Sequence, residues 1–174
     1  MRSRTVMQNR KKQFVGWIGV SVALTIIMLQ IGLRYEQPDD YLISGIIGGA
    51  YGKGLNQILI APYISPVLGI ILNIIYIITG FFNVYSLFLI VAYLLCITNL
   101  HAIVYWQGKS WKWNLFICLF EIFYLFYFTY TTVAYLLIGT GILIIYVKNN
   151  RETIGIQGGV SILLGILLRK QVLI

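Results

Sequence analysis

The sequence predicts an all-α membrane protein, a polytopic transmembrane helical bundle. Residues of the hydrophobic class make up 59% of the chain and charged residues only 10%, with a mean hydropathy of +0.85. A water-soluble domain has a charged fraction of about a quarter. Apolar runs near the roughly 20 residues that a membrane helix needs recur along the chain. The runs are continuous rather than alternating, which argues against a β-barrel.

The basic residues flank these apolar runs. The net charge is +8, and five of the 13 lysines and arginines precede the first run: Arg2, Arg4, Arg10, Lys11 and Lys12. This distribution is the positive-inside pattern, so it predicts a multi-pass protein of the cell membrane with a cytoplasmic N-terminus. It does not indicate a nucleic-acid partner, and we expect membrane lipids to surround the chain.

We expect a basic N-terminus, residues 1–13, followed by a single transmembrane domain, residues 14–174. This domain should hold about five to six hydrophobic helices and one amphipathic helix. The expected hydrophobic helices are Phe14–Leu33, Tyr63–Phe82, Tyr85–Tyr105, Trp113–Phe128, Thr132–Val147 and Gly158–Leu168. Phe14–Leu33 is long and lacks a small-residue cleavage site, so we interpret it as a retained span.

The first outer loop, about residues 34–62 or as far as 84, contains the amphipathic helix. Its apolar face has helical spacing and consists of Leu42, Ile43, Ile46, Ile47 and Ala50. We expect Gly52 and Gly54 to end this helix. The run GGAYGKG is not a phosphate-binding loop, because Ile47 and Gly54 replace residues that such a loop requires.

The segment Tyr63–Phe82 decides which side of the membrane the later charges face. It is apolar enough to cross, but it begins within APYISP and contains Asn73. If it crosses, Lys109 and Lys148 lie outside with their basic neighbours. If it lies along the outer leaflet or dips into it, both lie in the cytoplasm, as the positive-inside rule prefers. We favour the second layout, although hydropathy alone supports the first.

Two adjacent aspartates, Asp39 and Asp40, follow Pro38 in the first outer loop. Carboxylates this close to hydrocarbon cost free energy, so we expect them to have a structural or functional role. In one interpretation Pro38 ends the preceding segment and one aspartate caps a helix that begins near Tyr41. In the other, the pair faces an extracytoplasmic active site. A cap accounts well for one aspartate and poorly for two.

Under the favoured layout, further polar side chains gather on the same outer face. The predicted catalytic residues are Asp39 and Asp40, with Asp40 as a candidate metal ligand. The predicted substrate-binding residues are Glu36, Lys53, Thr129, Thr131 and Arg169.

Four other residues lie within hydrophobic runs. Glu121 is a functional candidate by its position in a membrane helix, but we favour a structural role in which it joins two helices. We favour a packing role for His101 as well, because no second His, Cys or carboxylate lies three or four residues away. Cys96 and Cys118 lack metal-type spacing and are predicted to pack rather than to form a disulfide.

Four stretches carry a resemblance to a known family. After the basic N-terminus and one span, the chain contains PDDYLISGIIGGAYG, PYISPVLGIILNIIY, FTYTTVAYLLIGTG and GILLR. In this order the chain resembles the N-terminal third of GT-C-type, multi-spanning glycosyltransferase-like proteins of Gram-positive bacteria, which are linked to cell-surface polysaccharide.

The resemblance implies a polyprenyl-phosphate sugar donor and an acceptor outside the cell. Asp39 and Asp40 match the acidic pair of the family's first outer loop, and Arg169 matches an arginine at the outer end of a later span. We expect Asp39 to be the general base, and Asp40 to contact the acceptor or a divalent metal, Mg²⁺ or Mn²⁺. The reverse assignment of the two aspartates stays open. Because such proteins are much longer, we expect this chain to be an N-terminal portion or remnant, or to work with a partner membrane chain.

Two other functional classes stay open. A non-enzymatic membrane subunit or scaffold would use the aspartates only to cap a helix. A transporter or flippase component would use polar residues near the middle of the membrane, and Glu121, Gly139 and Gly141 give slight support for it.

Overall fold

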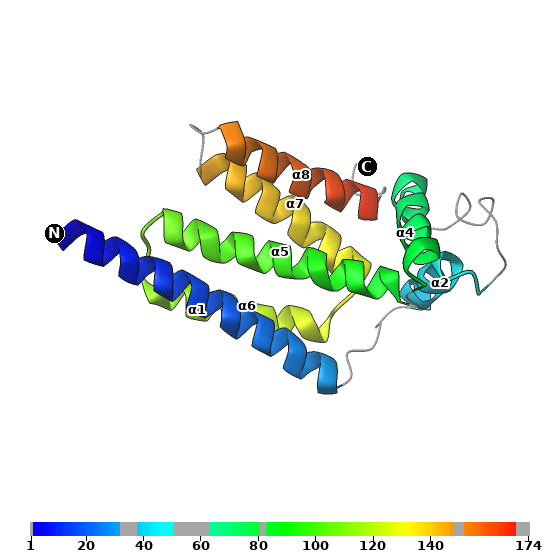
Figure 1. The fold of residues 1–174 in the computed structure, drawn as a ribbon, viewed down its shortest axis with the longest axis horizontal. Coiled ribbons are helices and arrows are strands. Elements are labelled where there is room, and N and C mark those ends of the chain that lie inside the picture. Colours follow the sequence, from blue (N-terminus) through cyan, green and yellow to red (C-terminus); the bar gives the residue numbers. More distant parts are fainter. Residues whose placement is uncertain (1, 32–37, 51–62, 81–82, 148–151, 170–174) are drawn as a thin grey trace.

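The computed structural model describes residues 2–31, 38–50, 63–80, 83–147 and 152–169, which form α-helices and contain no strand (Figure 1). The helices are α1 (Arg2–Ile31), α2 (Pro38–Ile47), α4 (Pro66–Thr79), α5 (Val84–Trp106), α6 (Trp111–Phe126), α7 (Tyr130–Val147) and α8 (Glu152–Leu168). The all-α prediction is therefore confirmed. The first helix is longer than expected, because it continues through the basic N-terminus.

The helices α1, α5, α6, α7 and α8 run along the long axis of the molecule, whereas α2 and α4 lie at one end of it (Figure 1). Helix α4 is set across that end. The Ser65 amide donates to the Leu167 carbonyl at the end of α8, at 2.9 Å, and the Asn73 side chain donates to the Ile47 carbonyl of α2, at 3.0 Å. Asn73, the residue that made this segment ambiguous in the sequence, thus joins α4 to α2.

The length of α4 agrees with the layout in which this segment does not cross. Its 14 residues make a helix about 21 Å long, shorter than the roughly 30 Å hydrocarbon core. Among the described residues, three helical segments are long and apolar enough to span a membrane: Lys11–Ile31, Val84–Trp106 and Tyr130–Val147. The larger number of spans expected from the sequence stays a prediction.

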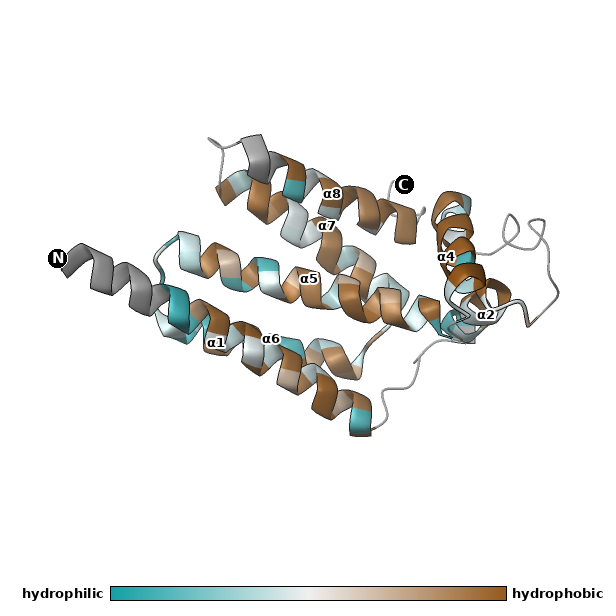
Figure 2. Cartoon of the chain, viewed as in Figure 1, coloured by the Kyte–Doolittle hydropathy of each residue, from teal (hydrophilic) through white to brown (hydrophobic). Residues whose placement is uncertain are grey.

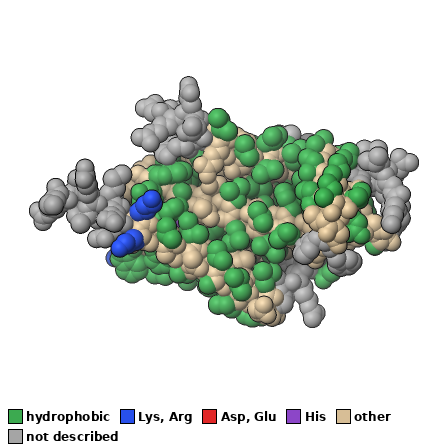
Figure 3. Space-filling model, in the orientation of Figure 1, with side chains coloured by type: hydrophobic (Ala, Val, Ile, Leu, Met, Phe, Trp, Pro, Cys, Tyr) green, Lys and Arg blue, Asp and Glu red, His purple; other side chains and the backbone are tan. Residues whose placement is uncertain are grey.

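The outer surface of the bundle is apolar over most of its length (Figures 2 and 3). In α6, for example, Phe116, Phe123 and Phe126 are each about 60% exposed or more. A continuous apolar surface of this extent is unusual in a soluble monomer and is expected where lipid is the solvent.

Charged side chains lie at the two ends of the bundle. The end that we call the basic end carries Lys11, Lys12, Lys109 and Lys112. Contact between the Phe14 and Tyr105 rings, 5.3 Å apart, joins α1 to α5 there. The opposite end, which we call the acidic end, carries Asp39 and Asp40 of α2 and Arg169, which directly follows α8. The side of a membrane that each end faces stays a prediction, and Lys148 and Arg151 lie outside the described residues.

Helix α2 differs from the sequence prediction at both of its ends. It begins at Pro38 rather than near Tyr41, since the fixed φ of proline suits the first turn of a helix. It ends at Ile47, and the turn that follows contains Gly49, whose φ of 72° is left-handed. The amides of Gly49 and Ala50 donate back to Ile46 and Gly45, at 3.2 and 2.9 Å, which completes a Schellman motif. Gly52 and Gly54 lie outside the described residues.

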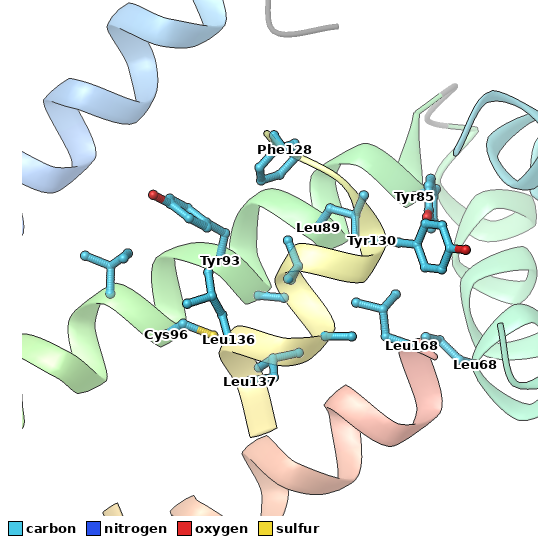
Figure 4. Close-up of a cluster of buried hydrophobic side chains, with 14 of the residues drawn as sticks. Leu68, Tyr85, Leu89, Tyr93, Cys96, Phe128, Tyr130, Leu136, Leu137 and Leu168 are labelled. Carbon is cyan, nitrogen blue, oxygen red and sulfur yellow. The ribbon is translucent and has the colours of Figure 1, made fainter. Parts of the chain in front are cut away.

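The apolar core lies mainly between α5 and α7, with contributions from α2, α4 and α8 (Figure 4). The predicted apolar face of α2 packs into it in part, because Ile43 and Ile47 are buried whereas Ala50 is exposed. Tyr85 and Tyr130 occupy the acidic end of this core, where they meet the predicted site.

Candidate functional site

Asp40 is fully buried at the acidic end of the bundle. Its Oδ1 accepts a hydrogen bond from the Tyr85 hydroxyl at 2.7 Å and a weaker one from the Tyr130 amide at 3.4 Å. Its Oδ2 is buried and has no hydrogen-bond partner in the described part of the chain. One carboxyl therefore joins α2, α5 and the first residue of α7.

This geometry corrects the capping interpretation. Since α2 begins at Pro38, both aspartates lie in its first turn and not at the position before the helix. Asp40 instead accepts the first amide of α7, one of the amides that have no partner within their own helix. A negative charge near the N-terminal end of a helix is favourable, so Asp40 stabilises the start of α7.

Burial is also the main influence on the acidity of Asp40. It raises the pKa of this carboxyl from 3.8 to about 6. The hydrogen bonds from Tyr85 and Tyr130 favour the charged form and oppose this rise, whereas the neighbouring Asp39 adds to it. A carboxyl with a pKa near neutrality in a polar cluster is a candidate functional group.

Asp39 and Arg169 are more accessible than Asp40 and lie at the same end of the bundle. Both side chains are partly exposed. The Arg169 guanidinium lies over the Tyr135 ring, 5.6 Å from its centroid, and its Nε is buried without a hydrogen-bond partner among the described residues. Charges of Arg169, Asp39 and Asp40 all act on the Tyr130 hydroxyl. Three of the predicted site residues are thus near enough to Tyr130 to act on its hydroxyl electrostatically, and Asp40 also contacts its amide.

The remaining predicted site residues have different outcomes. Thr129 is buried, and its hydroxyl accepts the Thr132 amide at 3.2 Å. This contact makes Thr129 the N-cap of α7 and engages the group that was expected to bind substrate. Thr131 is partly exposed. Glu36 and Lys53 lie outside the described residues.

The described residues do not build a metal site around Asp40. No group of three His, Cys, Asp or Glu side chains gathers within the described ranges, and Asp39 is the only neighbouring acid that acts on Asp40. A hard divalent cation prefers six or more oxygen ligands. The Mg²⁺ or Mn²⁺ prediction therefore has no support from these residues.

Sequence reasoning missed Tyr85 and Tyr130, which hold Asp40. Each lies at the end of a predicted span, where tyrosine is common in membrane proteins for reasons unrelated to a site. No pattern in the sequence distinguishes a tyrosine that contacts lipid headgroups from Tyr85, whose hydroxyl donates to a buried carboxyl, and Tyr130 donates to it with a backbone amide that any residue but proline would supply.

His101 and Glu121, the two ionisable residues that the sequence places inside hydrophobic runs, lie away from the acidic end, between α1, α5 and α6. His101 is hydrogen-bonded to Ser21 and Asn114, and Glu121 is fully buried between helices. These contacts agree with the packing role expected for His101 and the helix-joining role expected for Glu121. Cys96 and Cys118 are buried free thiols, as predicted.

Comparisons of this chain with protein-family models, with curated proteins and with solved structures find no match.

Proposed function

We propose that the acidic end of the bundle is the active site of a membrane glycosyltransferase. The enzyme would transfer a sugar from a polyprenyl-phosphate donor to a cell-surface glycan or lipid acceptor, with the N-terminus in the cytoplasm. The observation that supports the proposal is that Asp39 and Asp40 of α2 lie at the same end of the bundle as Arg169, and that all three act electrostatically on Tyr130. An acid for the acceptor and a cation for the phosphate are the two groups that this reaction needs.

Each of these residues has a role suited to its exposure. Asp39 is accessible and takes the proton of the acceptor hydroxyl as its oxygen attacks the anomeric carbon. The bond from that carbon to the phosphate oxygen breaks, and the electron pair leaves with the phosphate, beside the Arg169 guanidinium. Asp40 is too buried to touch the acceptor, so it acts as a positioning residue that fixes α2 against Tyr85 and α7.

Asparagine substitutions test this assignment. We expect Asp39→Asn to lower sugar transfer by roughly 10²–10⁴-fold, the usual contribution of a general base, without loss of folded protein. Asp40→Asn should have a smaller effect on transfer. The measurement is transfer of a labelled sugar from polyprenyl phosphate by membranes that contain the complete protein. If Asp39→Asn and Asp40→Asn both transferred sugar at the wild-type rate, the proposal would be contradicted.

The contacts of Asp40 also favour a second candidate, a non-enzymatic membrane subunit. Asp40 joins α2, α5 and α7, which is sufficient reason to keep a buried carboxyl. In that case Arg169→Gln and Asp39→Asn should leave every cellular phenotype unchanged. Tyr85→Phe, which removes a hydrogen bond to Asp40, should lower stability alone.

A further inference from the structure

Five polar side chains form a buried seam between α1, α5 and α6, which we call the polar seam: Ser21, Thr25, His101, Asn114 and Glu121. All but Asn114 are buried. In a bundle with an apolar outer surface, ionisable and polar groups at this depth are expensive and commonly functional. The proposed site at the acidic end does not use them.

Hydrogen bonds and polar contacts connect the seam from one end to the other. The His101 Nδ1 lies 2.8 Å from Asn114 Oδ1, and its Nε2 lies 3.1 Å from the Ser21 hydroxyl. Because the amide oxygen of Asn114 only accepts, Nδ1 carries the proton and Nε2 accepts from Ser21. The side chains of Ser21 and Thr25 are the hydrogen-bonding neighbours of the Glu121 carboxyl. The Thr25 hydroxyl donates to the Ser21 carbonyl at 3.0 Å and lies 3.4 Å from Glu121 Oε1.

The seam opens at the basic end. A cavity of about 30 Å³ is lined there by His101 and Asn114 together with Gln13, Tyr105 and Lys109. This volume is enough for a water molecule, and the lining offers the polar partners that a water needs. His101 therefore faces a water-sized cavity on one side and Ser21 on the other.

Glu121 lies at the inner end of the seam without a compensating charge. Its Oε2 is buried with no hydrogen-bond partner among the described residues. The titratable groups that act with it are Tyr93 and Cys118, and the Tyr93 hydroxyl donates to the Glu121 carbonyl at 3.0 Å. None of these groups is a cation. A carboxyl in this environment is stable in its protonated form and costly as a bare anion.

We propose that Glu121 is a proton-binding site that exchanges its proton with the basic end of the bundle through Ser21 and His101. In the releasing direction, the Glu121 proton moves to the Ser21 oxygen while the Ser21 proton moves to His101 Nε2. The imidazolium then gives its Nδ1 proton, which it had donated to Asn114 Oδ1, to water in the cavity that both residues line, and Glu121 is left as a carboxylate. Thr25 positions the carboxyl, and Asn114 holds the ring of His101. Binding a proton reverses each step.

A purely structural glutamate would not need this arrangement. To join helices, Glu121 needs only an oxygen that accepts from Thr25, and a glutamine would supply one. A histidine between the carboxyl and a water-sized cavity adds nothing to that contact. It is, however, the side chain best suited to carry a proton between two hydrogen-bonded groups near neutral pH.

Infrared spectroscopy of the full chain in lipid vesicles tests the proposal. The band of a protonated carboxyl that disappears in Glu121→Gln belongs to Glu121, and the Asp40 band is assigned by Asp40→Asn. We expect the Glu121 band to convert to carboxylate as pH rises and to exchange with deuterium oxide in the wild type. Ser21→Ala and His101→Gln should each slow that exchange by roughly a hundredfold.

The matched control is Ser161→Ala. Ser161 is also a buried helical serine, with its hydroxyl bonded to the Gln157 carbonyl at 3.0 Å, but it belongs to α8 and lies outside the seam. Its substitution should leave the exchange rate unchanged. The proposal is overturned if Glu121 shows no protonated band at any pH, if its band never titrates, or if both seam variants exchange at the wild-type rate. If Ser21→Ala does not fold, the pH titration of the Glu121 band in the wild type and the exchange rate in His101→Gln still test the proposal.

Discussion

Two regions of the bundle are held together by different means. Helices α7 and α8 meet through glycines that bring their backbones into contact, whereas α1, α5 and α6 meet through the hydrogen-bonded polar seam. A methyl group added at Gly158 would lie 2.9 Å from the Gly141 carbonyl oxygen, and one added at Gly165 would lie 2.8 Å from the Ala134 carbonyl oxygen. No side chain can enter either contact without a shift of the helices.

The difference follows from lipid as a solvent. Between membrane helices there is little hydrophobic driving force, so close packing of small residues and interhelical hydrogen bonds take its place. Glycine packing does not depend on protonation, whereas hydrogen bonds between ionisable groups do. The α7–α8 pair is therefore suited to be a fixed support, and the polar seam is suited to respond to protons.

The largest expected effect comes from filling the α7–α8 contact. We expect Gly158→Ala and Gly165→Ala each to lower the free energy of unfolding by roughly 1–3 kcal/mol, the usual range for overpacking. The controls are Gly139→Ala and Gly159→Ala, in the same two helices, where an added methyl meets nothing within 4 Å. These should be neutral or stabilising, since alanine is the better helix former. Denaturant or thermal unfolding in detergent measures all four, and equal effects would show that the glycines do not hold the pair together.

A smaller and more selective effect is expected in the polar seam. Glu121→Gln keeps an acceptor for Thr25 and should preserve stability. Glu121→Leu removes this acceptor, while Thr25 keeps its 3.0 Å bond to the Ser21 carbonyl, and should cost roughly 1–2 kcal/mol. The same unfolding measurement distinguishes the two variants. If Gln is as damaging as Leu, the charge of Glu121 stabilises the fold, and the comparison with the glycine contact must be revised.

The acidic end sharpens the comparison, because α7 takes part in both kinds of contact. Folding raises the Asp40 pKa from 3.8 to about 6, so the folded state binds more protons between these values. Stability from this group is therefore complete below pH 3.8 and is lost as pH rises through about 6. Asp40→Asn should remove this pH dependence. Thermal unfolding at a series of pH values measures it, and an unchanged pH profile in the variant would exclude Asp40 as its source.

The removal of one hydrogen bond gives an independent check on that profile. Tyr85→Phe deletes the hydroxyl that favours the carboxylate of Asp40. The loss of stability should then occur at a higher pH than in the wild type, while Asp40→Asn shows no such loss. A shift to lower pH would contradict the assignment.

The sequence predicted the helices well and the polar contacts only in part. Continuous apolar runs and the basic residues beside them identified the bundle, because both follow from the thickness and charge of a membrane. The position of Asp40 in the first turn of α2, and its bond to α7, could not be predicted, since 90 residues separate it from Tyr130. Ser21 likewise lies 80 residues from His101, so no local spacing reveals the polar seam.

The smallest expected effect tests how the glycine-packed helix α7 begins. Thr129 caps α7, as its hydroxyl accepts the Thr132 amide while the Thr132 hydroxyl accepts the Thr129 amide at 3.0 Å. We expect Thr129→Ala to cost about 1 kcal/mol of stability, as is usual for a lost N-cap. Thr131→Ala, two residues away and partly exposed, is the matched control and should change stability by a few tenths of a kcal/mol at most. Thr129→Ser keeps the accepting oxygen and should restore the cap, which separates capping from packing of the threonine methyl. If Thr129→Ala and Thr131→Ala unfold alike, α7 is held at this end by Asp40 and its glycine contacts alone.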